Sequence, residues 1–249
     1  MFPLNFKPRA NLLQDRNILI TGATGGIGKA LSLACAELGA TVLLHGRNIG
    51  ELNKLYDAIT ALKLPEPFLL PLDLSTASAG EFKNIQTVVS RATGKLDGIV
   101  HCANMVSDLG PLHSQTTKQW EDLFRINVSS VFGLNQALLP CLSQSDSGSI
   151  VITSDHHTRT LDNFWGGYVV TKAALEAYAK LQHNELHTEQ NLRVNIVVPG
   201  PINSPMRSKT HPGEDREKLP PIESIIPLYV WLLSSESKTI SGQTFDHSS

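Results

Sequence analysis

Thr21-Gly22-Ala23-Thr24-Gly25-Gly26-Ile27-Gly28 lies between the apolar run 18–20 and a helix-forming run that starts at Ala30. This order predicts a buried strand, a tight turn and a helix. Such a turn brings bare backbone N–H groups and the positive end of a helix dipole to one point, where a phosphate group can bind. Gly22 permits the sharp turn, Gly26 lets the backbone approach a pyrophosphate, and Gly28 lets the helix pack on the strand. The stretch is a candidate dinucleotide-binding turn, with an ordinary strand-to-helix turn as the alternative.

Apolar segments of strand length alternate with helical segments along the rest of the chain. The expected strands are 18–20, 41–44, 68–70, 96–102, 149–153 and 194–198, and the expected helices are 30–34, 52–62, 82–92, 120–139 and 168–186. Strands that are nearly all apolar and alternate with helices are typical of a parallel sheet covered on both faces. The sequence therefore predicts an α/β fold: a single-domain, doubly wound, Rossmann-like parallel sheet with helices on both faces.

The chain of 249 residues contains no linker rich in Pro, Gly or Ser, so one domain spanning 1–249 is expected. Residues 1–16 are interrupted by Pro3 and Pro8, and they form an N-terminal extension without the apolar core of a signal peptide. Six prolines fall between Pro199 and Pro221, and they predict a loop rather than a helix.

The composition argues against nucleic-acid and membrane partners. The formal net charge of -2 gives no excess of positive charge that would favour nucleic-acid binding, and no apolar run is long enough to span a bilayer. We expect a cytoplasmic protein whose partners are a small molecule and other copies of itself. No metal site is expected, because Cys35, Cys102 and Cys141 form no CxxC pair, and because His183 and His187 fit a solvated helix face better than a zinc pair.

Residues directly after the strands are the place to seek a ligand site, because ligands of doubly wound folds bind at the carboxyl ends of the strands. Arg47 follows the second strand, where an NAD-binding protein usually has an acid for the ribose hydroxyls. Its guanidinium suits the 2′-phosphate of NADP, so NADP(H) is favoured over NAD(H); a solvated surface arginine is the alternative. Asp73, after the third strand, could accept from an adenine amino group or cap the next helix.

Tyr168 and Lys172 are four residues apart at the start of a predicted helix, so both side chains can act on one ligand. An ammonium beside a phenol lowers the tyrosine pKa towards neutrality and makes Tyr168 a workable general acid or base. The pair becomes specific in combination with the upstream glycine turn and with Asn127 in the segment 125–128.

With these motifs the sequence resembles the short-chain dehydrogenase/reductase superfamily in its compact single-domain branch, and most closely the YciK-type oxidoreductases of bacteria. The resemblance covers nearly the whole chain. The residues that carry it are Gly22 to Gly28, Asp73-Leu74, Asn127, Tyr168, Lys172, Pro199-Gly200, Ser204-Pro205-Met206, 228–232 and 244–246.

The resemblance implies hydride transfer between NADP(H) and a carbonyl or alcohol. In the family the tyrosine moves a proton to or from the substrate oxygen, the lysine binds the nicotinamide ribose, and the asparagine holds a water in the proton relay. Only three residues separate Tyr168 from Lys172, whereas enoyl reductases of the superfamily typically have six. The cofactor-binding residues implied are Gly22, Thr24, Gly25, Gly26, Ile27, Gly28, Arg47, Asp73, Leu74, Ala103, Tyr168, Lys172, Pro199, Gly200, Ile202 and Ser204. Residues 200–221 resemble the substrate-covering loop, Phe164 or Trp165 could line the substrate pocket, and homodimers or homotetramers are expected.

The sequence departs from the family at two places. Where the fourth strand usually ends in Asn-Asn-Ala-Gly, this chain has His-Cys-Ala-Asn at 101–104 and loses an asparagine that braces the sheet and a glycine beside the cofactor. We expect cofactor binding to survive this change in weakened form. The family's catalytic serine falls on Asp155. Losing one such hydrogen-bond donor costs about 10² to 10³ in rate, and an ionised carboxylate at about 4 Å would repel a developing oxyanion by roughly 4 kcal/mol.

Asp155 must therefore be protonated, turned away or relieved of its charge. Ser154 could replace the serine only if the chain bulges there. Alternatively, a protonated Asp155, His156 or His157 donates the hydrogen bond. We expect an NADP(H)-dependent oxidoreductase with Tyr168, Lys172, Asn127 and Asp155 at its catalytic site and with weak or acid-favoured turnover. The alternative is a catalytically impaired NADP(H)-binding protein with a regulatory or sensing role.

Overall fold

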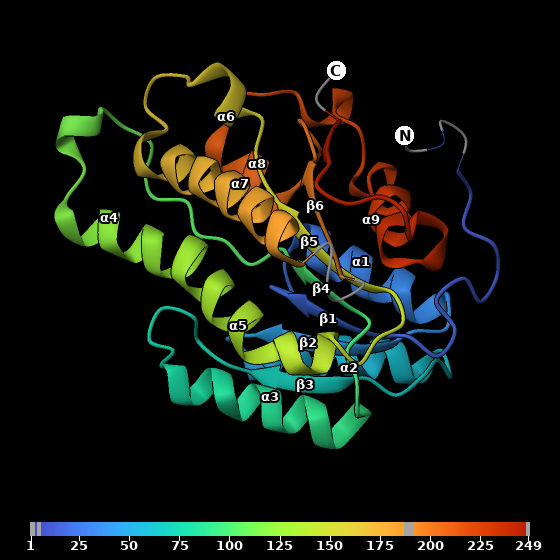
Figure 1. Cartoon of the computed structure of the whole chain (residues 1–249). Coiled ribbons are helices and arrows are strands. Elements are labelled where there is room, and N and C mark those ends of the chain that lie inside the picture. Colours follow the sequence, from blue (N-terminus) through green and yellow to red (C-terminus); the bar gives the residue numbers. More distant parts are fainter. Residues whose placement is uncertain (1–2, 4–5, 187–191, 248–249) are drawn as a thin grey trace.

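Seven parallel strands form one sheet, in the order β3-β2-β1-β4-β5-β6-β7, within the part of the chain that the computed structural model describes, residues 3, 6–186 and 192–247 (Figure 1). The strands are β1 (Asn17–Thr21), β2 (Thr41–Gly46), β3 (Phe68–Pro71), β4 (Gly98–His101), β5 (Gly148–Thr153), β6 (Leu192–Val198) and β7 (Thr244–Asp246). The helices are α1 (Gly26–Glu37), α2 (Ile49–Ala61), α3 (Ala79–Thr93), α4 (Thr117–Phe124), α5 (Ser130–Leu142), α6 (His157–Thr160), α7 (Gly166–Leu186), α8 (Pro205–Thr210) and α9 (Ile226–Leu233).

Helices cover both faces of the sheet (Figure 1). On one face, apolar side chains of α1, α2 and α9 pack on alternate strand residues such as Ile18 and Leu44. On the other face, α3, α5 and α7 pack on the intervening residues such as Leu19 and Leu43. The five inner strands, β2, β1, β4, β5 and β6, are buried along nearly their whole length, which is why they read as mainly apolar runs. The predicted doubly wound fold is confirmed.

The strand order reverses at β1, which pairs with β2 on one side and with β4 on the other. Thr21 at the end of β1 lies in register with His45 of β2 and with His101 of β4. The chain leaves these strands towards opposite sides of the sheet, and this opens a crevice at their carboxyl ends.

The turn between β1 and α1 accepts no larger residue at its glycines. A Cβ on Gly28 would lie 2.1 Å from the carbonyl oxygen of Gly22. Gly22 has a positive φ of +63°, and its Cβ would lie 2.9 Å from the backbone of Ala103 on the loop after β4. The turn is therefore pressed against the adjacent loop, and glycine is required for steric reasons.

One prediction about local structure is wrong. The prolines of 199–221 predict a loop, but α8 forms there because Ser204 caps the helix, its Oγ accepting from the amide of Arg207 at 3.2 Å, and because Pro205 suits the first helical position. The helical segment expected at 120–139 is confirmed: α4 and α5 are joined without a break by a π-helical turn, Arg125–Ser129. Strand β7 is not among the expected strands. It has only three residues and takes its register from β6.

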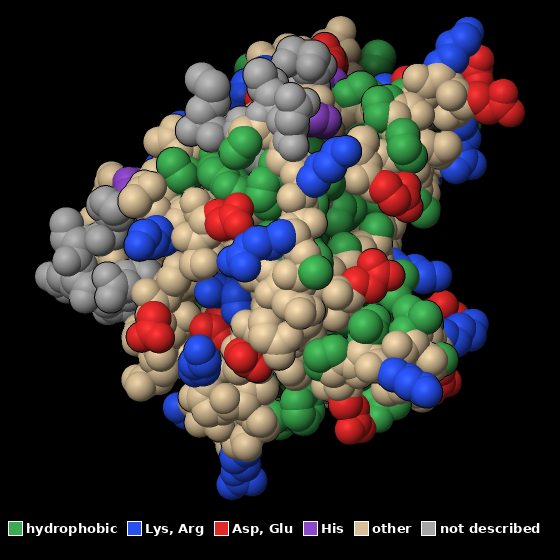
Figure 2. Space-filling model, turned by 90° about the vertical axis from the view of Figure 1, so that its right-hand side faces the viewer, with side chains coloured by type: hydrophobic (Ala, Val, Ile, Leu, Met, Phe, Trp, Pro, Cys, Tyr) green, Lys and Arg blue, Asp and Glu red, His purple; other side chains and the backbone are tan. Residues whose placement is uncertain are grey.

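No helix within the described residues is long and apolar enough to cross a membrane. On the face drawn in Figure 2, Lys and Arg side chains are interspersed with Asp and Glu rather than gathered in a patch of one sign. The zinc pair rejected from the sequence involves His187, which lies outside the described residues, and His183, whose Nδ1 is 2.8 Å from Ser241 Oγ.

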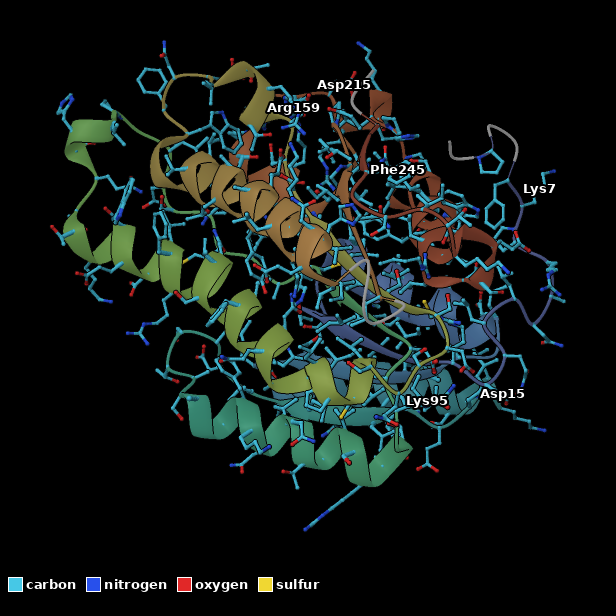
Figure 3. The ribbon with its side chains drawn as sticks, in the orientation of Figure 1. Lys7, Asp15, Lys95, Arg159, Asp215 and Phe245 are labelled. Carbon is cyan, nitrogen blue, oxygen red and sulfur yellow. The ribbon has the colours of Figure 1, made fainter. Side chains whose placement is uncertain are left out.

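Asp97 is a buried carboxylate at the start of β4. Its oxygens accept from Ser145 Oγ at 2.6 Å and from the amide of Asn17 at 3.0 Å, and Lys95 Nζ lies 3.1 Å away. Lys95 lies at the end of the sheet remote from Arg159 in Figure 3. Burial raises the pKa of Asp97, but these hydrogen bonds and the charge of Arg16 outweigh burial and lower it below its usual value. Asp97 is therefore charged and stabilising at neutral pH.

Replacing Gly28 by alanine is expected to destabilise the fold, because the new methyl group would overlap the Gly22 carbonyl. The free energy of unfolding in urea should fall by about 1–3 kcal/mol. Gly213→Ala is the control, because its Cβ would meet nothing within 4 Å, and it should change the unfolding free energy by less than about 0.5 kcal/mol. Equal stabilities of the two variants would contradict the packing described for the turn.

Asp97→Asn is expected to lower the unfolding free energy at pH 7 by about 1–3 kcal/mol, because it removes a charge that accepts buried hydrogen bonds. A carboxyl group whose folded pKa is depressed stabilises the protein above its unfolded pKa of about 3.9, and this stability is lost as the pH falls through the folded pKa. The difference between variant and parent should therefore shrink below about pH 4. Exposed Asp146→Asn is the control, and a difference that is constant with pH would contradict the assignment.

Candidate active site

A cavity of about 660 Å³ opens at the carboxyl ends of the strands. Its wall combines the β1–α1 turn, the segments after β2 to β6, and helices α7 and α8. The structure brings to this wall every sequence-predicted site residue except Asn127: Gly22, Thr24, Gly25, Gly26, Ile27, Gly28, Arg47, Asp73, Leu74, Ala103, Asp155, Tyr168, Lys172, Pro199, Gly200, Ile202 and Ser204. Predicted cofactor and catalytic residues thus share one cavity.

The glycine end of the cavity fits a phosphate-bearing dinucleotide. Gly25 is the N-cap of α1 and offers no side-chain hydrogen bond, so the first amides of α1 have no side-chain cap there. A Cβ on Gly26 would lie 3.0 Å from Pro205 and 3.1 Å from Ile222, so this position on the cavity wall has little room for a side chain. Arg47 lies exposed on the cavity wall just past the end of β2. These residues suit an anionic ligand with a second phosphate near Arg47.

Asp73 forms a turn of its own rather than capping a helix. Its Oδ1 accepts from the amide of Ser75 at 2.9 Å and from the Ser75 hydroxyl at 2.8 Å, and these bonds lower its pKa. The cap of α3 is Ser78. Of the two roles considered for Asp73, the structure excludes the helix cap and leaves the carboxylate on the cavity wall.

His45 is a cavity residue that sequence reasoning missed. Its side chain is 2% exposed, and neither ring nitrogen has a hydrogen-bond partner among the described residues. Burial, with the charge of nearby His101, lowers the pKa of His45 to about 4, so the ring is neutral at pH 7. A buried polar group without a partner is costly. A ligand that reached His45 would relieve this cost.

Asp155 contacts the hydroxyl of Tyr168 directly. Tyr168 extends from the first turn of α7, and its hydroxyl donates to Asp155 Oδ2 at 2.9 Å. The other oxygen, Oδ1, accepts from the amide of His157 at 3.0 Å and lies 2.6 Å from His157 Nδ1. The carboxylate is therefore not turned away from the tyrosine.

The contacts of Asp155 favour its ionised form, so the structure does not support the predicted protonated donor. Burial raises the pKa of Asp155, but the hydrogen bonds from the ring and amide of His157, the charge of His157 and the bond from Tyr168 lower it to about 2. Of the three possibilities for Asp155, the structure supports neither a protonated carboxyl group nor one turned away: the charge is retained, and hydrogen bonds from the His157 amide and the Tyr168 hydroxyl stabilise it. At neutral pH the carboxylate accepts hydrogen bonds and donates none.

The expected lowering of the Tyr168 pKa is also wrong in this state. Burial, together with the charge and hydrogen bond of Asp155, raises the pKa of Tyr168 well above its usual value. Lys172 is more distant, with Nζ 5.6 Å from the centre of the Tyr168 ring, and it donates to the carbonyl of Thr153 at 3.0 Å. Burial lowers the pKa of Lys172 to about 8 against the raising effect of Asp155. The carboxylate, not the ammonium, dominates the phenol.

Ser154 does not take the place of the missing serine. Its hydroxyl donates to Glu176 Oε1 of α7 at 2.6 Å. Glu176 also accepts from Arg159 of α6, whose Nη1 lies 2.7 Å from Oε2; Arg159 is labelled in Figure 3. This network holds Ser154 away from Tyr168, and it ties α6 to α7.

Asn127 positions the catalytic helix from behind the cavity. It is fully buried in the π-helical turn, where its Oδ1 accepts from the Met105 amide at 2.7 Å. Its Nδ2 donates to the Met105 carbonyl at 2.9 Å and to Thr171 Oγ1 at 3.0 Å. Thr171 in turn donates to the carbonyl of Tyr168 at 2.7 Å. Asn127 therefore connects the loop after β4 with the turn of α7 that carries Tyr168.

The altered end of β4 keeps the cavity wall in place by other bonds. His101 Nε2 lies 2.8 Å from Asn135 Oδ1 of α5, and the amide of Ala103 donates to Thr21 Oγ1 at 3.1 Å. Trp165 lines the cavity next to Tyr168, whereas Phe164 lies on a separate, smaller pocket with Leu109. Of the two aromatic candidates, only Trp165 lies on the cavity that holds Tyr168.

Comparisons with known proteins agree with this geometry. Residues 16–215 match the family model of the short chain dehydrogenases. The chain is 37% identical over 243 residues to the oxidoreductase YciK of Escherichia coli K12, over 98% of this chain and 96% of YciK.

Solved structures give the same result. A short chain dehydrogenase of Salmonella enterica serovar Typhi has a TM-score of 0.94 at 38% identity, covering 97% of this chain and 99% of its own. A short chain dehydrogenase of Shigella flexneri 2a complexed with NADP has a TM-score of 0.92 at 37% identity, covering 96% of this chain and 99% of its own.

Proposed function

This chain belongs to the short-chain dehydrogenase family, as its motifs predict, and we propose that it transfers a hydride between NADP(H) and a carbonyl or alcohol substrate. The observation that carries the proposal is the shared cavity, whose wall contains the glycine turn and Arg47 together with Tyr168, Lys172 and Asp155. Bound NADP(H) would supply the hydride or accept it. The protein must bind it, hold the substrate oxygen beside Tyr168 and move one proton.

The preference for NADP(H) over NAD(H) rests on Arg47. No acidic residue occupies the end of β2, where His45, Gly46 and Arg47 follow one another. A guanidinium there can form charge-assisted hydrogen bonds with a 2′-phosphate, which NAD(H) lacks. The complex of the Shigella relative with NADP supports this preference.

Proton transfer is assigned to Tyr168, with Asp155, Lys172 and Asn127 as its neighbours. To give a proton to a substrate oxygen, the hydroxyl must leave Asp155 Oδ2, to which it donates at 2.9 Å. This bond therefore competes with the substrate, and a negative charge beside the hydroxyl opposes the build-up of charge on the substrate oxygen. Slow turnover follows as long as the charge of Asp155 is not balanced.

The same contact favours a second function, an NADP(H)-binding protein with impaired catalysis. A carboxylate that holds the proton of the catalytic tyrosine leaves the cofactor cavity intact while disabling the proton donor. Both functions predict that the protein binds NADP(H). Only the oxidoreductase predicts substrate turnover that is lost when Tyr168 is replaced.

A homo-oligomer is part of the proposal. Phe132 of α5, with Val170 and Leu181 of α7, is an exposed large apolar side chain. The Phe132 ring lies 6.3 Å from that of Tyr178, so α5 and α7 are in contact there. Exposed apolar side chains on adjacent helices support association through this surface.

Tyr168→Phe is expected to lower kcat/KM for NADPH oxidation with an active carbonyl substrate by at least about 10², with the NADPH dissociation constant unchanged within threefold. A panel of ketones, aldehydes and quinones, assayed after EDTA treatment, identifies the substrate.

Under the same conditions Asp155→Ser should increase the rate of NADPH oxidation, because a hydroxyl donor replaces the charge. Turnover that persists in Tyr168→Phe would contradict the role of Tyr168; a silent parent beside an active Asp155→Ser would favour the impaired binding protein.

Arg47→Ala is expected to weaken NADPH binding by roughly 10- to 100-fold, because charge-assisted hydrogen bonds contribute about 1.5–3 kcal/mol. NADH has no 2′-phosphate, so its affinity should change by less than threefold. Titration calorimetry of both cofactors measures this difference, and Arg91→Ala on the exposed face of α3 is the matched control. Equal losses of affinity for NADPH and for NADH would show that Arg47 does not bind the 2′-phosphate.

A further inference from the structure

Asp155 does not stand alone beside Tyr168, because two histidines follow it. Asp155 Oδ1 lies 2.6 Å from His157 Nδ1 and 3.6 Å from His156 Nδ1. Within the described residues, these three side chains are the group of His, Cys, Asp or Glu whose ligand atoms all approach one another within 4.8 Å. All three lie on the wall of the cavity that contains Tyr168.

The spacing of these atoms suits one small cation. A tetrahedral zinc ion with bonds of about 2.0–2.1 Å holds its ligand atoms roughly 3.4 Å apart. The two distances from Asp155 Oδ1 bracket this value. Two imidazoles with one carboxylate are a donor set that first-row transition metals take from proteins, and three protein ligands leave a position open, as in catalytic zinc sites.

The surroundings hold the donors in place. The ring of His157 is stacked on Trp165, with centroids 3.6 Å apart, and the ring of His156 packs 3.9 Å from that of His157. The second nitrogen of His157, Nε2, lies 3.7 Å from Asp162 Oδ2. Metal-binding histidines commonly direct their other nitrogen towards such a carboxylate.

The nearest cationic side chains are engaged elsewhere. Arg207 of α8 forms two hydrogen bonds with Glu214, at 2.6 and 2.7 Å. Lys172 donates to the carbonyl of Thr153. Asp155 Oδ1 and His157 Nδ1 lie 2.6 Å apart and share a proton, and a cation that replaced this proton would satisfy the same two atoms.

We propose that Asp155, His156 and His157 bind one divalent transition-metal cation of the zinc type. The site itself follows from the donor geometry; its part in catalysis rests on the proposed function. A cation on Oδ1 balances the charge that Asp155 presents to Tyr168 through Oδ2, so the hydroxyl is freed to serve a substrate. The cation would also polarise the substrate oxygen as a Lewis acid. In this way it would replace the hydrogen bond from the serine hydroxyl that this chain lacks.

The site is tested on the full chain after EDTA treatment, without substrate or cofactor. Co²⁺ is titrated in and followed by its visible absorption, and Zn²⁺ is then added as competitor. We expect one Co²⁺ per chain, displaced by Zn²⁺, with affinity reduced at least ~10-fold in His156→Gln and in Asp155→Asn. His113→Ala, an exposed histidine away from the cavity, is the matched control and should bind like the parent.

Failure to take up Co²⁺, or equal affinity in the parent and in both ligand variants, would overturn the site. Circular dichroism of each variant guards against loss of the fold. Since Tyr168 is outside the donor set, Tyr168→Phe should bind Co²⁺ as the parent does.

The catalytic part is measured separately, as NADPH oxidation with and without one equivalent of Zn²⁺. Zn²⁺ should accelerate the parent by at least ~10-fold and leave His156→Gln unaffected. Equal stimulation of both would overturn the catalytic part. If no carbonyl compound is turned over with or without Zn²⁺, the proposed function fails while the Co²⁺ titration still decides the site. If Co²⁺ does not bind, turnover that depends on Tyr168 still supports the function.

Discussion

The hydrogen bond from the Tyr168 hydroxyl to the Asp155 carboxylate determines what this active site can do. A carboxyl group whose pKa is held near 2 is a weak base, and a phenol whose pKa is raised by that carboxylate is a weak acid. Neither is suited to move a proton at neutral pH while this hydrogen bond persists. A group that offsets the negative charge of Asp155 would therefore control proton transfer by Tyr168. His156 and His157 matter because their Nδ1 atoms lie closest to Asp155 Oδ1.

The scaffold around this contact is that of a working dehydrogenase. Gly22 and Gly28 in the turn after β1 have no room for a Cβ, Asn127 ties the loop after β4 to the turn of α7 that carries Tyr168, and Lys172 is held by the Thr153 carbonyl. The residues predicted to bind the cofactor line the cavity, and the departure from the family pattern lies at Asp155, beside the Tyr168 hydroxyl. A chain that had lost all function would not be expected to keep the cavity residues while the catalytic serine position alone changes.

Much of the fold could be predicted from the sequence because its strands are apolar on both faces and its glycine turn has few alternatives. The elements that were missed depend on distant partners: β7 exists through its pairing with β6, and α8 through the match of Ser204 and Pro205 to a helix start. The positions of Tyr168 and Asp155 along the chain were clear, but the state of their protons was not. It depends on His157 and on burial, which only the folded chain brings together. The orphaned ring of His45 could not be foreseen for the same reason.

The most direct test of this account is an ultraviolet difference titration of tyrosinate in EDTA-treated protein, comparing the parent with Tyr168→Phe. If the carboxylate of Asp155 governs the phenol, Tyr168 gives no tyrosinate signal below about pH 10, the ordinary tyrosine pKa. In Asp155→Asn, by contrast, its signal should move to lower pH. A tyrosinate signal from Tyr168 near neutral pH in the parent would show that Lys172 dominates the phenol, and it would contradict the control of Tyr168 by Asp155.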